Sequence, residues 1–305
     1  MKSDFQHLAM AKLCGWFGIT RQAYYQQNQD DIQSTIEEEL IIQEVSNIRE
    51  KHPRMGGRKL YHLLLPFMQE HRIKMGRDAL FTMLSENHLL VRKRKRIIRT
   101  TNSYHRFKKY PNLIRNFIAT APNQLWVSDI TYWKINTQKH VYISFITDVY
   151  SHKIVGYQVA ETLAVVETIQ ALNMALLAIG PTRPVQLVHH SDRGFQYCNP
   201  AYVKLLEDYK IGISMTENSD PLENALAERI NGIVKEEYLN AYEVNTIKEA
   251  KSLLTSVIEL YNNERPHMSI GNLKPNQVHQ SNVPIVTKRL WKNYYQKHRT
   301  FVNQS

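Results

Sequence analysis

The sequence of 305 residues contains few cysteines and no long apolar run. Its two cysteines, Cys14 and Cys198, lie far apart and form no CxxC pair, so neither a disulfide framework nor a thiolate zinc site is expected. No stretch approaches the roughly 18 to 20 apolar residues that a membrane span needs, and the first residues lack the apolar core of a signal peptide. We therefore expect a cytoplasmic protein with reduced, structural thiols and no membrane partner.

Basic residues are concentrated in the first part of the chain. The formal net charge is +11, and residues 1–120 carry 21 Lys/Arg against 11 Asp/Glu, whereas residues 121–305 carry 18 against 17. The excess is densest in one short segment, the basic run, which contains Arg92, Lys93, Arg94, Lys95, Arg96 and Arg99. Such density favours contact with a nucleic-acid backbone, although a solvated linker has the same composition.

Residues 1–91 are predicted to be helical. Apolar residues recur at helical spacing over about 31–51, RKLYHLLL forms a second helix that ends at Pro66, and GRDALFTMLSENHLL forms a third. Three short helices joined by tight turns fit a helix-turn-helix DNA-binding region, and they fit a plain helical bundle equally well. Residues 92–120 show no sustained periodicity and are predicted to be a basic linker.

Residues 121–280 alternate between strand-like and helix-like patterns. LWVSDITYWKI, HVYISFITDVY and KIVGYQVA predict three antiparallel strands. A helix over about 164–179, the strand VQLVHH, the helix NPAYVKLLEDYK and the strand IGISMTE follow, and two long helices come last. Three hairpin-connected strands followed by βα units are the order of the RNase H-like fold. We therefore expect an α/β domain of that class after an all-α, helix-turn-helix-like region, and a basic and aromatic tail at 281–305.

Three acids in this domain occupy positions that suit phosphodiester chemistry. Asp129 interrupts an apolar strand, where a charge must be paired, bound to a ligand or directed into a cleft. Asp192 follows the strand VQLVHH, and Glu228 lies on a predicted helix over 222–240. Carboxylates can hold two Mg²⁺ ions roughly 3.5–4 Å apart, which activate a nucleophile and stabilise the phosphoryl oxygens.

The predicted helix over 222–240 has one apolar and one polar face. Its buried stripe contains Leu222, Leu226, Ile230, Ile233 and Tyr238. Its polar stripe contains Asn224, Glu228, Asn231 and Lys235. On this stripe Lys235 can hold a phosphate while Glu228 holds a metal. Each acid also has a structural explanation, an ion pair or turn for an Asp and solvation for a Glu, and Asp148 and Glu223 are alternative sources of a carboxylate.

The spacing of these acids and the residues around them resemble a known family. Asp192 and Glu228 are separated by 35 residues, and the sequence contains the segments WVSDIT, HHSDRGFQY, ENALAERINGIVKEE and YNNERPH. These are similar to the second-reading-frame (OrfB) transposases of the bacterial insertion sequence family three, IS150-like group. LCGWFGITRQAYY and MGGRKL extend the likeness to the N-terminal part. The resemblance implies a retroviral-integrase-like core with a D,D(35)E triad that uses Mg²⁺ or Mn²⁺, two ions per active site.

Carried onto this chain, the resemblance places the catalytic, metal-binding triad on Asp129, Asp192 and Glu228 and not on Asp148 or Glu223. Positions that the family keeps near its site are matched by Trp126, Thr131, Gly194, Gln196, Tyr197 and Asn224. His190 and Asn231 are expected to line the site as well, and His189 is interpreted as structural. DNA contacts are expected from Lys235, Arg193 and the basic run.

One segment departs from the family pattern. Where the family has Trp-Asp-Asn-Ala before its glutamate, this chain has Pro221-Leu222-Glu223-Asn224-Ala225, so the local helix start is in question. His189, His190 and Cys198 do not have the spacing of a tetrahedral zinc site. The tail KRLWKNYYQKHRTF interleaves basic and aromatic residues, which suits either stacking on a DNA strand or docking onto protein.

The activity implied by the resemblance is that of a DDE transposase. It would cut the ends of its mobile element by water attack and join the freed 3′-hydroxyl to another phosphodiester. Expected partners are double-stranded DNA at the transposon ends and the target, at least one further copy of the chain, and an upstream-frame (OrfA) protein or fusion, in a nucleoid-associated setting. The alternatives are a catalytically silent DNA-binding regulator or assembly subunit and a plain RNase H-like nuclease.

Overall fold

A computed structural model describes the chain over residues 9–91, 105–115, 117–136, 139–180, 186–217 and 224–281, apart from the side chains of 28 and 30–32. The basic run, the segment 218–223 with Glu223, and the predicted tail from 282 onward lie outside these described residues. The chain divides into two compact units. One consists of Met1–Lys51 and Gly56–Val91, and the other of His52–Met55 and Arg92–Ser305.

The first unit is helical, as predicted, but two helices are longer than their sequence patterns. Its helices are α1 (Met10–Trp16), α2 (Arg21–Lys51), α3 (Gly57–Glu70) and α4 (Arg77–Glu86). Helix α2 begins ten residues before the predicted 31, just after Thr20, whose hydroxyl accepts a hydrogen bond from the Ala23 amide at 3.1 Å. The apolar period appears only near the C-terminal half, where Ile41 and Val45 are buried.

Pro66 does not end the second helix, contrary to the prediction. Helix α3 continues through it to Glu70. Leu60, Leu64 and Met68 are buried at four-residue spacing in the core of this unit. Their burial continues on both sides of Pro66, so packing outweighs the local cost of a proline inside a helix.

The second unit is built on a five-stranded mixed sheet with the strand order β3-β2-β1-β4-β5. The predicted antiparallel meander is confirmed, because β1 pairs with β2 and β2 with β3 in antiparallel fashion. Strands β4 and β5 extend the sheet in parallel from β1. The strand bounds are β1 Leu125–Lys134, β2 His140–Asp148, β3 Ile154–Ala160, β4 Val188–Ser191 and β5 Gly212–Met215.

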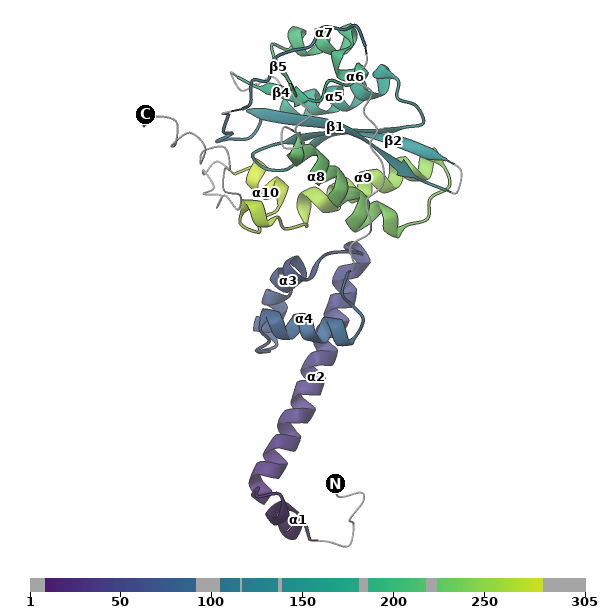
Figure 1. Cartoon of the computed structure of the whole chain (residues 1–305). Coiled ribbons are helices and arrows are strands. Elements are labelled where there is room, and N and C mark those ends of the chain that lie inside the picture. The colour runs from purple at the N-terminus through teal and green to yellow at the C-terminus, as the bar shows by residue number, and fades with distance from the viewer. Residues whose placement is uncertain are drawn as a thin grey trace, which may run out of the picture. The chain divides into compact units, whose positions relative to one another are not determined.

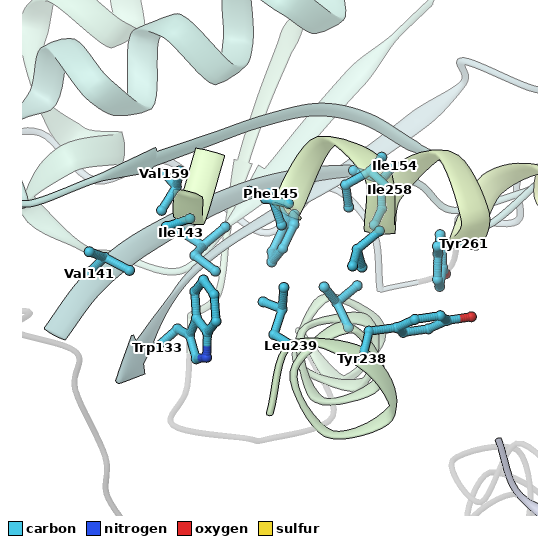
Figure 2. Close-up of a cluster of buried hydrophobic side chains, with 14 of the residues drawn as sticks. Trp133, Val141, Ile143, Phe145, Ile154, Val159, Tyr238, Leu239, Ile258 and Tyr261 are labelled. Carbon is cyan, nitrogen blue, oxygen red and sulfur yellow. The ribbon is translucent and has the colours of Figure 1, made fainter. Parts of the chain in front are cut away.

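Helices cover both faces of this sheet, as the ribbon shows (Figure 1). One face carries α5 (Val165–Ile179), α6 (Phe195–Cys198) and α7 (Pro200–Asp208), and the other carries α8 (Ala225–Ile233), α9 (Ile247–Asn263) and α10 (Pro275–His279). Each face has its own apolar core. In the core under α8 and α9, Tyr238 and Leu239 lie near Phe145 of the sheet (Figure 2).

The predicted helix over 222–240 is not one regular α-helix. It starts at Ala225 as α8, passes into a π-helical turn at Val234–Tyr238 and ends in a 3₁₀ turn at Leu239–Ala241. Tyr238 and Leu239 are adjacent in sequence, yet both are buried. In a regular α-helix, consecutive side chains point about 100° apart, so adjacent residues rarely face the same core. A π turn has more residues per turn and changes this angle, which lets both side chains face the core.

Part of the predicted linker over 92–120 packs against the sheet. The Pro111 carbonyl accepts a hydrogen bond from the Met215 amide at 3.3 Å, and the Leu113 amide donates to Ser214 Oγ at 2.9 Å. The described residues 105–115 therefore run beside the edge strand β5. Within the described part of the chain, no helix is both long and apolar enough to cross a membrane.

Candidate active site

Asp129 lies in the middle of β1, on the face of the sheet covered by α8. Its side chain is half-buried. Oδ1 accepts a hydrogen bond from the Ile130 amide at 2.9 Å, and Oδ2 accepts one from Asn231 Nδ2 of α8 at 2.8 Å. Two fixed donors therefore hold the carboxylate in one orientation.

Asp192 follows β4, the strand that pairs in parallel with β1. Its Oδ1 accepts a hydrogen bond from the Gly194 amide at 2.9 Å. A Cβ atom at position 194 would lie only 2.9 Å from this same oxygen, so a larger residue there would displace the Asp192 carboxylate. The predicted support from Gly194 thus takes the form of a backbone donor to Asp192.

The pKa of Asp129 shows that the three acids lie close enough to influence one another. Burial, joined by the nearby charges of Asp192 and Glu228, raises the pKa of Asp129 to about 8, against the opposing effect of the hydrogen bonds from Ile130 and Asn231. A carboxylate that is shielded from water and repelled by two others binds a proton or a cation readily. Such a raised pKa is typical of functional sites where carboxylates gather.

Helix α8 lies alongside β1 through its predicted polar stripe. Asn224 Nδ2 donates to the Ser128 carbonyl at 3.2 Å, and Asn231 reaches Asp129. Both asparagines are buried, while Glu228 between them is exposed in the first turn of α8. The predicted buried stripe is present at Ile230 and Tyr238, with Val234 added, whereas Leu226 and Ile233 are partly buried.

Lys235 projects from the start of the π turn onto β1. Its Nζ donates to Thr131 Oγ1 and to the Tyr132 carbonyl, both at 3.0 Å, and lies 4.6 Å from the centre of the Tyr132 ring. Thr131 is two residues beyond Asp129 on the same strand. A cationic group is therefore fixed next to the acidic cluster.

The donor set of the site fits a hard divalent cation in its chemistry. The carboxylates of Asp129, Asp192 and Glu228 are oxygen ligands of the kind that Mg²⁺ prefers. Within the described residues, Asn224 Oδ1 and Asn231 Oδ1 are buried and accept no hydrogen bond, so two more oxygens are available. However, no three His, Cys, Asp or Glu side chains of the described residues lie close enough to form a ready-made metal group. Final convergence would require side-chain movement, and Glu228 is exposed enough to move.

Three other predicted site residues form hydrogen bonds elsewhere on the sheet. Trp126 is fully buried on the opposite core of the sheet, and its Nε1 donates to Asn123 Oδ1 at 3.1 Å. His190 is buried in β4 with Nδ1 2.8 Å from Ser214 Oγ. Arg193 Nη1 donates to the Glu217 carbonyl at 3.2 Å. Through these hydrogen bonds, the three residues contact the sheet and its edge.

His189 has the structural surroundings expected from the sequence. Its Nε2 lies 2.7 Å from Ser128 Oγ and 3.0 Å from the Tyr202 hydroxyl. Burial lowers the pKa of its imidazole to about 3, so the ring is neutral. The two cysteines are free and buried, and Cys198 Sγ lies 3.6 Å from Met215 Sδ.

Asp148, the alternative carboxylate on β2, is enclosed in a separate network. It is fully buried and accepts hydrogen bonds from the amides of Asn123 and Ser151, both at 2.7 Å. His279 Nδ1 of α10 lies 3.7 Å from the same carboxylate and 2.9 Å from Ser151 Oγ. Its hydrogen bonds thus give Asp148 a structural explanation.

One pair near the site was not found by sequence reasoning. Glu237, in the π turn, forms two hydrogen bonds of 2.8 Å with Arg265, which is 1% exposed. The sequence carried one indication, the Arg265-Pro266-His267 motif, but its partner is 28 residues away and cannot be read from spacing.

Comparison with known proteins gives the family. An integrase core domain model matches residues 119–221, and a second model of the same description matches residues 209–275. The insertion element IS600 uncharacterized 31 kDa protein of Shigella sonnei is 36% identical over 269 residues, which cover 86% of this chain and 96% of that protein. The S. sonnei transposase for insertion sequence element IS629 is 30% identical over 278 residues, covering 88% and 91%.

Among solved structures, the HTLV-2 integrase catalytic core domain in complex with magnesium is similar, with 20% identity and a TM-score of 0.42, over 52% of this chain and 98% of that one. The two Shigella relatives match along nearly their whole length, and the integrase core models cover the sheet and the helices around the acids. The chain therefore belongs to the insertion-sequence transposases that carry an integrase core domain.

Proposed function

We propose that this transposase cleaves DNA strands and joins 3′-hydroxyl ends to a new phosphodiester, with Asp129, Asp192 and Glu228 as its catalytic, metal-binding carboxylates. The observation that carries the proposal is that Asp129 of β1, Asp192 after the paired strand β4 and Glu228 of α8 lie close enough for the charges of the other two acids to act on Asp129, together with burial. Within an integrase core domain, such mutual repulsion favours cation-dependent chemistry on a phosphodiester.

The proposed cofactor is Mg²⁺ or Mn²⁺, two ions per active site. When bound, two such ions activate the attacking oxygen and stabilise charge on the phosphoryl group and the leaving oxygen. Asp129, Asp192 and Glu228 would hold them. The supporting residues keep the ligands in place: Asn231 orients Asp129 through its 2.8 Å hydrogen bond, and the Gly194 amide orients Asp192.

Lys235 is proposed to hold a phosphate of the DNA beside the carboxylates. Its ammonium group lies over the C-terminal part of β1 and reaches Thr131 Oγ1 and the Tyr132 carbonyl. Thr131 thereby directs the lysine toward the scissile strand. A fixed cation next to the acidic cluster positions the negatively charged backbone without taking part in proton transfer.

The wider DNA path and the partners are part of the same proposal. Residues 1–91 are proposed to bind the transposon ends, residues 121–280 to form the catalytic core and residues 281–305 to form a tail. Of the predicted linker at 92–120, residues 105–115 pack beside β5 and belong with the core. Arg193 and the basic run at Arg92–Arg96 are proposed to contact target or end DNA. Because two ends must be joined, at least a dimer is proposed, together with an upstream-frame protein or fusion.

A strand-transfer assay with pre-cut end DNA of the element and Mn²⁺ tests the catalytic assignment. Asp192→Asn and Glu228→Gln are expected to abolish joined products while the protein still binds the DNA. Asp208→Asn is a matched control, because Asp208 is an exposed acid on helix α7 whose salt bridge, within the described residues, is to Lys204. Activity that survives both substitutions would overturn the triad. If the unaltered protein binds DNA without reaction, it is a silent regulator, and hydrolysis without joining indicates a plain nuclease.

A further inference from the structure

The π turn at Val234–Tyr238 is fixed by a buried ion pair. Arg265 Nε and Nη2 each donate to one oxygen of Glu237 at 2.8 Å, a bidentate arrangement that fixes direction as well as distance. Arg265 Nη1 also lies 2.8 Å from His267 Nε2. The side chain of Arg265 is 1% exposed and that of Glu237 is 18% exposed, so water competes little with the pair.

A second contact holds the same turn from another direction. The Arg54 amide donates to the Glu237 carbonyl at 3.2 Å, and His52 Nδ1 lies 2.9 Å from the Tyr238 hydroxyl. Residues His52–Met55 belong to the catalytic unit, although they connect α2 with α3 in the sequence. The backbone and the side chain of Glu237 are therefore both engaged.

The turn that is held in this way also carries Lys235. Lys235 is two residues before Glu237, and the two side chains point to different parts of the unit: Lys235 toward Thr131 on β1, and Glu237 toward Arg265 after α9. A π turn is less stable than the α-helical continuation and persists where its surroundings fix it. Release of Glu237 would allow the turn to relax and would change the direction of Lys235.

We infer that Glu237 and Arg265 are positioning residues, which hold the π turn so that Lys235 lies beside the carboxylates and contacts a DNA phosphate. Neither residue touches DNA in this role. The inference rests on the proposed function of Lys235 and adds the ion pair that orients this lysine. It also gives the buried charged pair a role beyond stability, since an apolar pair of similar volume is often equally stable or more so.

The test is a double-mutant cycle read from the salt dependence of DNA binding. The probe is a short fluorescein-labelled duplex with a pre-cut 3′ end, and binding is measured by anisotropy over a range of salt concentrations. Lys235→Ala removes one phosphate contact. It is expected to reduce the magnitude of the slope of log binding constant against log salt concentration by about 0.9. Glu237→Gln and Arg265→Lys are expected to lower it by the same amount. Either change combined with Lys235→Ala is expected to lower it no further.

The control for simple loss of stability is Asn262→Ala. Asn262 on α9 exchanges two hydrogen bonds of 3.0 Å with the Ile154 backbone, and its amide group makes no hydrogen bond to the π turn within the described residues. This variant is expected to melt at a lower temperature but to keep the full slope. An equal reduction of the slope in Asn262→Ala would overturn the inference, because a general loss of stability would then explain the reduction seen in Glu237→Gln and Arg265→Lys.

Two further outcomes also overturn the inference. One is a full slope in Glu237→Gln, and the other is losses that add in the double variant. If Lys235→Ala itself keeps the full slope, the lysine has no phosphate to hold and the inference fails. The catalytic proposal is then still decided separately, because the strand-transfer assay depends on Asp192 and Glu228.

Discussion

Two aspartates on neighbouring strands of the same sheet have opposite surroundings. Asp148 is fully buried and is satisfied by the amides of Asn123 and Ser151. Asp129 is half-buried and is repelled by Asp192 and Glu228. The first carboxylate is enclosed by donors that stabilise the fold, whereas burial and the two neighbouring acids disfavour the charged form of the second. The comparison teaches that a carboxylate whose charged form its surroundings disfavour, rather than one satisfied by donors, marks the candidate active site.

The largest expected difference between the two aspartates is the effect of their substitution on strand-transfer activity. Asp129→Asn is expected to reduce strand transfer by on the order of 10³-fold or more, because an amide replaces a proposed metal ligand of the same size. The fold should persist, since the asparagine can still bond to the Ile130 amide. Product formation on a sequencing gel measures the loss, and far-ultraviolet circular dichroism checks the fold. Near-normal activity in this variant would remove Asp129 from the triad.

The largest expected difference in stability lies at Asp148. Asp148→Ala leaves the buried amide of Ser151 and the part-buried amide of Asn123 without acceptors and should lower the free energy of unfolding by about 3 kcal/mol. Asp129→Asn should not lower it. Urea denaturation of the two variants in parallel measures the contrast. An equally large loss for both would mean that Asp129 also has a mainly structural role.

The pH dependence of stability should separate the two aspartates further. The pKa of Asp129 is raised to about 8 in the folded protein, whereas an unfolded Asp titrates near about 4. Between these values the folded state binds more protons than the unfolded state, so this group's stabilising contribution is present at low pH and is lost as the pH rises toward about 8. Melting temperatures in chelator at pH 5 and pH 9 should differ less in Asp129→Asn. An unchanged difference would contradict the assigned pKa.

The smallest expected effect is on the residue that orients Asp129. Asn231→Ala removes the hydrogen bond to Asp129 Oδ2 and should raise the Mn²⁺ concentration needed for half-maximal activity by roughly 10-fold. The matched control is Asn240→Ala, because Asn240 makes its hydrogen bond to the exposed side chain of Glu236. Equal effects of the two substitutions would show that Asn231 has no particular role in metal binding.

The sequence predicted the succession of strands and helices along the second unit because each strand carries its own local pattern. It placed Asp129 on β1 and Asp192 after β4 for the same reason. It did not predict that α3 continues through Pro66 or that the second half of the polar helix becomes a π turn. Both depend on apolar partners that are distant in the sequence, and a local period does not contain them.

The surroundings of the acids show the same limit. The polar stripe of α8 was readable from its spacing, and Asn224, Asn231 and Lys235 do contact β1. The partner of Arg265 was not readable, because the ion pair with Glu237 joins the π turn to the segment after α9 through the interior. The raised pKa of Asp129 was equally hidden, since it depends on burial and on how closely β1, β4 and α8 bring their acids together.

The most direct test of a carboxylate metal centre is calorimetric titration of Mn²⁺ into the full chain at pH 7 and at pH 9. Binding to the unaltered protein should release a proton at pH 7 and almost none at pH 9, because Asp129 is protonated below about 8. Asp129→Asn, Asp192→Asn and Glu228→Gln should each bind Mn²⁺ more weakly, and Asp208→Asn should bind as the unaltered protein does. Unchanged binding in all three triad variants would contradict the assignment of Asp129, Asp192 and Glu228 as the metal ligands.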